Sequence, residues 1–210
     1  MTLPHPDTFL LHRVFRYLAG NNLSGHYLQF GMNGGFYLSY AWKLAHSWEV
    51  DRMREQETGV VTKGFPDMRF YAWDTEKDPE AQNVALCTGM PPERLTVTPG
   101  PFSSTFRGPQ RVPAASAAVV VVDLPNREDV RDALIFASLF MRENTVVVMN
   151  KWWQSSQQTE RGFFDWSRQI TIVGDHDDLV TQFQDNGWAR AFIVSKRIEQ
   201  WHFLQKSKNS

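Results

Sequence analysis

Two short apolar runs constrain the fold of this chain more than any other feature of its sequence. Ala117–Val122 contains only alanine and valine and is closed by Asp123, and Thr145–Met149 holds three consecutive valines. Runs of this length and composition are typical of strands that are buried on both faces of a parallel sheet. Parallel strands need crossover connections, usually helices that cover the sheet. The chain is therefore predicted to be an α/β protein.

The remaining segments alternate between strand-like and helix-like patterns. Further strands are predicted near residues 27–30, 68–73, 94–98, 170–173 and 191–195. Helices are predicted near residues 6–19, 36–48, 126–141, 162–168 and 178–184, with a polar helical continuation or loop from 48 to 57. We predict a single Rossmann-like, doubly wound, mostly parallel sheet with helices on both faces. One domain would span residues 1–210, with an N-terminal helical segment at 1–22 and a C-terminal tail at 196–210.

The composition of the chain indicates which binding partners and which cellular compartment to expect. The formal net charge of -1 offers no cationic footprint for a nucleic acid. The single cysteine, Cys87, excludes an internal disulfide and a cysteine metal cluster. No apolar run approaches the roughly 18 residues of a membrane span, and the N-terminus lacks a signal-peptide pattern. We expect a cytoplasmic protein that binds neither nucleic acid nor a membrane. Its eight tryptophans would suit an apolar contact between subunits, so a homo-oligomer is an alternative to a monomer.

A glycine-rich turn follows the first predicted strand. Tyr27–Phe30 leads into Gly31–Gly35, and the next predicted strand ends in Asp74. Glycines let the backbone approach a ligand closely, and an acid at the end of the second strand can accept both hydroxyls of a ribose. These residues predict a nucleoside cofactor. A nicotinamide dinucleotide is the less favoured choice, because the turn lacks the Gly-x-Gly-x-x-Gly pattern that seats a pyrophosphate.

Four predicted strand ends should meet at one edge of the sheet. They are Gly31–Gly35, Asp74, Asp123 and the segment 150–153. Ligands of open α/β sheets bind beyond the carboxyl ends of the strands, so this edge is the candidate site. Asp74 and Asp123 have a structural alternative, since acids in such positions also cap the helices that follow.

Several segments together resemble a known family. Gln29–Gly35 reads Gln-Phe-Gly-Met-Asn-Gly-Gly, Phe70–Asp74 reads Phe-Tyr-Ala-Trp-Asp, and Val97–Phe102 and Gly187–Phe192 follow in order. They resemble motifs of the macrocin O-methyltransferase family, class I enzymes that use S-adenosylmethionine to methylate sugar hydroxyls of natural products. The resemblance covers most of the chain and implies S-adenosylmethionine as the cofactor. The implied cofactor-binding residues are Gln29, Gly31, Asn33, Gly35, Asp74 and Gly100.

The resemblance breaks at the metal site of that family. There the fourth strand ends Asp-x-Asp-Leu-Tyr and the fifth ends Asp-Asp-Trp, and the first acid with the later pair holds magnesium. This chain has Val121, Asn150 and Lys151 at those positions, whereas Asp123 matches the proposed base. Valine offers no oxygen ligand and an ammonium repels a cation, so no metal is expected. Gln29 replaces the family's opening Glu and keeps hydrogen-bonding capacity without the charge.

Two functions follow from these residues. The first is a metal-independent O-methyltransferase acting on a hydroxyl of a small molecule or sugar. Asp123 would take the proton, Lys151 would stabilise the alkoxide beside Asn150, and Trp152 and Trp153 would line the acceptor pocket. The second is a catalytically inactive, methyltransferase-like binding protein. Lys151 as a solvent-exposed residue and the two tryptophans as core or subunit contacts are the structural alternatives.

Overall fold

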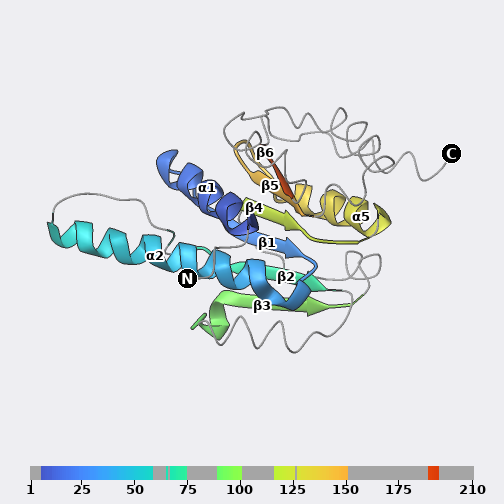
Figure 1. The fold of residues 1–210 in the computed structure, drawn as a ribbon, viewed down its shortest axis with the longest axis horizontal. Helices are drawn as coiled ribbons and strands as arrows, with labels where there is room; N and C mark the ends of the chain where they lie inside the picture. The colour runs from blue at the N-terminus through green and yellow to red at the C-terminus, as the bar shows by residue number, and fades with distance from the viewer. Residues whose placement is uncertain are drawn as a thin grey trace.

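Six strands form one sheet in the computed structural model, which describes residues 6–58, 65, 67–74, 89–100, 116–125, 127–150 and 189–193. The strand order is β3-β2-β1-β4-β5-β6 (Figure 1). The strands are β1 (His26–Phe30), β2 (Phe70–Asp74), β3 (Leu95–Pro99), β4 (Ala117–Val122), β5 (Val146–Asn150) and β6 (Ala189–Ile193). The first five are parallel and β6 is antiparallel to β5, so the predicted mostly parallel sheet is confirmed.

The described helices lie before or between these strands. They are α1 (Pro6–Gly20), α2 (Phe36–Thr58) and α5 (Arg127–Ser138), with short 3-10 helices η1 (Asn33–Gly35) and η2 (Pro92–Arg94). The polar continuation after residue 48 is helical, because α2 runs without interruption to Thr58. Its second half is rich in arginine, glutamate, glutamine and methionine, all good helix formers. The predicted strand at 170–173 and helices at 162–168 and 178–184 lie outside the described residues.

The sheet separates two apolar layers. Successive side chains of a strand point to opposite faces, and in β1 Tyr27 packs with α1 and α2 whereas Leu28 packs with α5. The same alternation places Val121 under α1 and α2 and Val122 under α5. Helices therefore cover both faces, as predicted (Figure 1). Burial on both sides explains why β4 needs a continuously apolar sequence.

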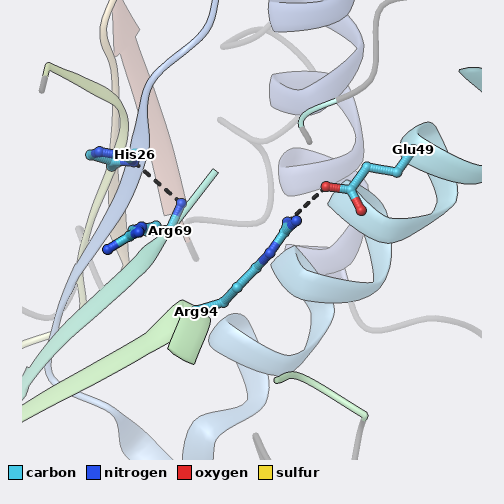
Figure 2. Close-up of polar contacts among 4 residues, drawn as sticks. All are labelled: His26, Glu49, Arg69 and Arg94. Atoms are coloured by element: carbon cyan, nitrogen blue, oxygen red, sulfur yellow. Dashed lines mark hydrogen bonds and ion pairs between the residues drawn. The ribbon is translucent and has the colours of Figure 1, made fainter. Parts of the chain in front are cut away.

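Arg94 joins the β3 edge of the sheet to α2. Its Nη1 atom lies 2.7 Å from Oε1 of Glu49 (Figure 2), and its guanidinium lies 5.7 Å from the ring centroid of Trp42. The two charged side chains are 27% and 12% exposed, so solvent screens the pair only in part. We expect Arg94→Met to lower the free energy of unfolding by about 1 kcal/mol in urea denaturation. Arg94→Lys should lose less stability, because it keeps the positive charge. An unchanged urea midpoint for Arg94→Met would show that the contacts of Arg94 do not stabilise the fold.

His26 opens β1 at the edge of the sheet opposite the strand carboxyl ends. Its Nδ1 atom accepts a hydrogen bond from the Arg69 N–H at 3.2 Å (Figure 2), which requires an unprotonated nitrogen. Burial first, and the charge of Arg69 second, lower the pKa of His26, whereas Asp67 opposes them. The unfolded chain then binds the proton more readily than the folded protein.

This difference predicts how stability depends on pH. The contribution of His26 is fully present above the unfolded pKa, about 6.5, and is lost as the pH falls from there toward the lowered pKa of the folded state. We expect His26→Asn, which keeps an acceptor for Arg69, to lose less stability than the wild type on acidification through this window. Urea midpoints measured across the pH series test this. Parallel decline of the two proteins would show that His26 does not contribute.

Candidate functional site

One row of residues crosses the sheet at the carboxyl ends of its strands. Phe30 pairs with Trp73 on one side and Val122 on the other, so Gly31 lies between Asp74 and Asp123. Val122 pairs with Met149, which places Asn150 next in the row, and Asp74 pairs with Pro99. The expectation that these strand ends share one edge is confirmed for Gly31, Asp74, Asp123 and Asn150. Lys151, Trp152 and Trp153 lie outside the described residues.

Gly31 lets the end of β1 touch the end of β4. Its φ is +83°, and a Cβ on it would lie 2.1 Å from the backbone oxygen of Asp123. Its N–H donates to the Trp73 carbonyl at 2.8 Å, and the Asp123 N–H donates to the Phe30 carbonyl at 2.8 Å. Gly31 is thus bonded to β2 and packed against β4. Only glycine fits here, because any Cβ would overlap the neighbouring backbone.

Asp74 faces the glycine turn. Its Oδ2 atom accepts a hydrogen bond from the Met32 N–H at 2.7 Å, and its backbone carbonyl accepts one from Gly100 at 2.8 Å. The residue is partly exposed. A carboxylate has about four acceptor sites, so the bond to Met32 is compatible with acceptance of ribose hydroxyls. The structure therefore brings together Asp74, Gly31 and Gly100, three of the predicted cofactor residues.

Asp123 lies on the other side of the turn and is only 2% exposed. The Asn33 side chain donates from Nδ2 to the Asp123 backbone oxygen at 2.8 Å, which ties η1 to the end of β4. The Gly35 N–H donates to the Met32 carbonyl at 2.8 Å and closes η1 just before α2 begins. Asn33 and Gly35 therefore shape the turn, and Asn33 also connects it to Asp123.

Gln29 acts on the same turn from inside the protein. Its side chain is fully buried; Oε1 accepts a hydrogen bond from the Tyr27 hydroxyl at 2.9 Å, and Nε2 donates to the Gly31 carbonyl at 2.9 Å. Sequence reasoning missed Tyr27. The signal was its position two residues before Gln29, which puts both side chains on the same face of one strand.

The positions that match the metal ligands of the resembled family contain no acid in this chain. Val121 is fully buried in the apolar layer under α1 and α2. Across the described ranges, no three histidine, cysteine, aspartate or glutamate side chains come close enough together to hold a metal ion. In the same part of the chain, no helix is both long and apolar enough to cross a membrane.

Comparison with known proteins identifies the fold. No protein-family model and no curated protein matches the chain. The O-methyltransferase NovP has a TM-score of 0.63 at 13% identity, covering 90% of this chain and 80% of that one. TomG from Streptomyces achromogenes, an O-methyltransferase of tomaymycin synthesis solved with S-adenosylmethionine, has a TM-score of 0.59 at 16% identity, covering 92% and 82%. The fold is that of the class I methyltransferases.

A third structure supports this assignment of a methyltransferase-like fold. The O-methyltransferase from Bacillus cereus, solved with S-adenosylhomocysteine, has a TM-score of 0.54 at 14% identity, covering 92% of this chain and 82% of that one. These identities are low, so the likeness concerns the fold. Membership of the macrocin O-methyltransferase family stays a prediction.

Within this methyltransferase-like fold, the edge of the sheet at the carboxyl ends of the strands (the rim) combines three chemical features. The glycine turn brings backbone groups to this edge, Asp74 is a partly exposed anionic acceptor, and Asp123 is a buried acid whose backbone contacts the turn. Polar interactions with a group withdrawn from water are stronger than at the surface. Asp74 and the glycine turn together suit a ligand with adjacent hydroxyls.

Proposed function

We propose that this protein is an S-adenosylmethionine-dependent O-methyltransferase that acts on a hydroxyl of a small molecule or sugar. The observation that carries the proposal is the position of Asp74, which is bonded to the Met32 N–H of the glycine turn at the carboxyl edge of a class I methyltransferase fold. Similar structures solved with S-adenosylmethionine or S-adenosylhomocysteine support the choice of ligand.

In the proposed complex, Asp74 accepts hydrogen bonds from the two ribose hydroxyls. Gly100 allows the nucleoside to approach the backbone, because it has no side chain, whereas Gly31 lets the glycine turn lie directly against Asp123. Asn33 and Gly35 hold the turn in shape, through the Asn33 bond to the Asp123 carbonyl and the Gly35 bond to the Met32 carbonyl. The buried Gln29 side chain supports the turn by donating a hydrogen bond from Nε2 to the Gly31 carbonyl.

We propose that the reaction needs no metal. When bound, S-adenosylmethionine would supply the methyl group to the acceptor oxygen, and S-adenosylhomocysteine would be the leaving group. Asp123 takes the hydroxyl proton, while Lys151, beside Asn150, stabilises the developing alkoxide. Trp152 and Trp153 line the acceptor pocket in this proposal. Methyl transfer depends mainly on proximity and in-line orientation, which do not require a metal.

A calorimetric titration tests the cofactor assignment. We expect S-adenosylmethionine and S-adenosylhomocysteine to bind with micromolar affinity that is the same with and without magnesium, and NADH to bind much more weakly. Asp74→Asn should weaken binding by about tenfold or more, because the ribose hydroxyls lose a charged acceptor. The matched control is Glu93→Gln, an exposed acid of η2 near the start of β3.

The outcomes separate the candidate functions. Tighter binding of NADH than of S-adenosylmethionine would favour the oxidoreductase. Binding of S-adenosylmethionine without methyl transfer to any hydroxyl acceptor would favour the inactive binding protein. Equal affinity of the wild type and Asp74→Asn would remove Asp74 from the site, whatever the ligand.

A further inference from the structure

One peptide group of the glycine turn is held from both sides. The Gly31 carbonyl and the Met32 N–H belong to the same peptide bond. The carbonyl accepts a hydrogen bond from Gln29 Nε2 at 2.9 Å, and the N–H donates to Asp74 Oδ2 at 2.7 Å. A buried amide on one side and a rim carboxylate on the other therefore fix the orientation of this peptide plane.

Tyr27 determines which end of the Gln29 amide faces the turn. Its hydroxyl donates to Gln29 Oε1 at 2.9 Å, and the tyrosine is fully buried. Burial first, and the negative charge of Asp123 second, raise the pKa of Tyr27 well above its ordinary value, so the hydroxyl keeps its proton. A permanent donor at Oε1 leaves Nε2, the donor end, for the Gly31 carbonyl.

An amide at position 29 can do what a carboxylate cannot. The glutamate of the resembled family could accept from Tyr27, but an ionised carboxylate has no N–H for the Gly31 carbonyl. It would also bury a charge in an apolar layer. Gln29 is thus matched to its two neighbours, one donor and one acceptor.

We propose that Tyr27 and Gln29 are positioning residues for Asp74: they hold the Gly31–Met32 peptide so that Asp74 is directed toward the two hydroxyls of a ribose. The ligand part of this inference rests on the proposed function. The hydrogen bonds that hold the Gly31–Met32 peptide, which we call the peptide clamp, do not depend on the ligand. They are three bonds among described residues.

Hydrogen exchange of the ligand-free protein tests the clamp. We expect Tyr27→Phe and Gln29→Met to speed exchange of the Met32 amide about tenfold relative to amides of β4, which corrects for changes in global stability. The matched control is Tyr71→Phe, a buried tyrosine on the α5 face of the sheet. Exchange at Met32 that changes only in step with β4 would overturn the clamp.

Ligand discrimination tests the effect on Asp74. S-adenosylhomocysteine is compared with an analogue that lacks both ribose hydroxyls, using calorimetry on the wild type and the two variants. We expect the variants to bind S-adenosylhomocysteine about tenfold more weakly and the analogue as the wild type does. Equal weakening for both ligands would overturn the positioning role. If the wild type binds neither, the proposed function fails, and hydrogen exchange still decides whether the clamp exists.

Discussion

Gly31→Ala is expected to lower the free energy of unfolding by about 4 kcal/mol, the largest stability change expected for this chain. The added Cβ would lie 2.1 Å from the backbone oxygen of Asp123 and 2.9 Å from its carbonyl carbon. Those atoms belong to the residue that directly follows β4, and this residue is bonded to β1 through its N–H and the Phe30 carbonyl. Relief of the overlap would require the two central strands to separate. Urea denaturation measures the loss.

Gly34→Ala is the matched control for this prediction. Gly34 lies in the same turn with φ +71°, but nothing lies within 4 Å of a Cβ built on it. Alanine at this position should cost only the left-handed backbone strain, about 1 kcal/mol. Similar losses for the two variants would show that strain alone, and not the close approach of β1 to β4, accounts for the glycine at position 31.

Asp123→Asn is expected to lower turnover by about 100-fold or more while affinity for S-adenosylhomocysteine stays within about twofold. Asparagine has nearly the same shape but cannot take the proton of the acceptor hydroxyl. The bond from Asn33 goes to the backbone oxygen of Asp123, so the substitution leaves this tie to the turn in place. Transfer of radiolabelled methyl from S-adenosylmethionine to a hydroxyl acceptor measures turnover.

The burial of Asp123 supplies the competing structural explanation. A carboxylate that is 2% exposed can stabilise the fold without taking part in the reaction. In that case Asp123→Asn would change the urea midpoint and leave turnover per bound cofactor unchanged, which would contradict its role as base. Lys151→Met is the companion variant: we expect a lower turnover that magnesium does not restore.

Local sequence patterns predicted each described strand to within two residues, although β6 begins at Ala189 instead of residue 191 and its antiparallel direction was not predicted. Ala117–Val122 is β4 with the predicted bounds, because burial on both faces leaves an uninterrupted apolar run. Parallel strands place their carboxyl ends on one edge, so the convergence of Gly31, Asp74 and Asp123 followed from the order of elements. The sequence does not predict where α2 ends, because the second half of this helix is polar and has no apolar periodicity.

The hydrogen bonds of the site depend on the folded arrangement and could not be predicted. Met32 meets Asp74 across 42 residues, and Asn33 meets Asp123 across 90, so no local pattern records these contacts. The bond between Tyr27 and Gln29 is different, since only two positions separate them. Strand alternation puts both side chains on one face of the sheet. It does not predict the second partner of Gln29, because the position of the Gly31 carbonyl depends on how the glycine turn folds.

An NMR-detected titration of the labelled wild-type protein with S-adenosylhomocysteine tests most directly whether the strand carboxyl ends bind the cofactor. Saturable shifts are predicted for the amides of Gly31, Met32 and Asp123, which surround the turn. The amide resonances of His26 and Arg69, at the opposite edge of the sheet, should keep their chemical shifts. No shifts at the turn, or shifts confined to the opposite edge, would contradict a cofactor site built on Asp74 and Gly31.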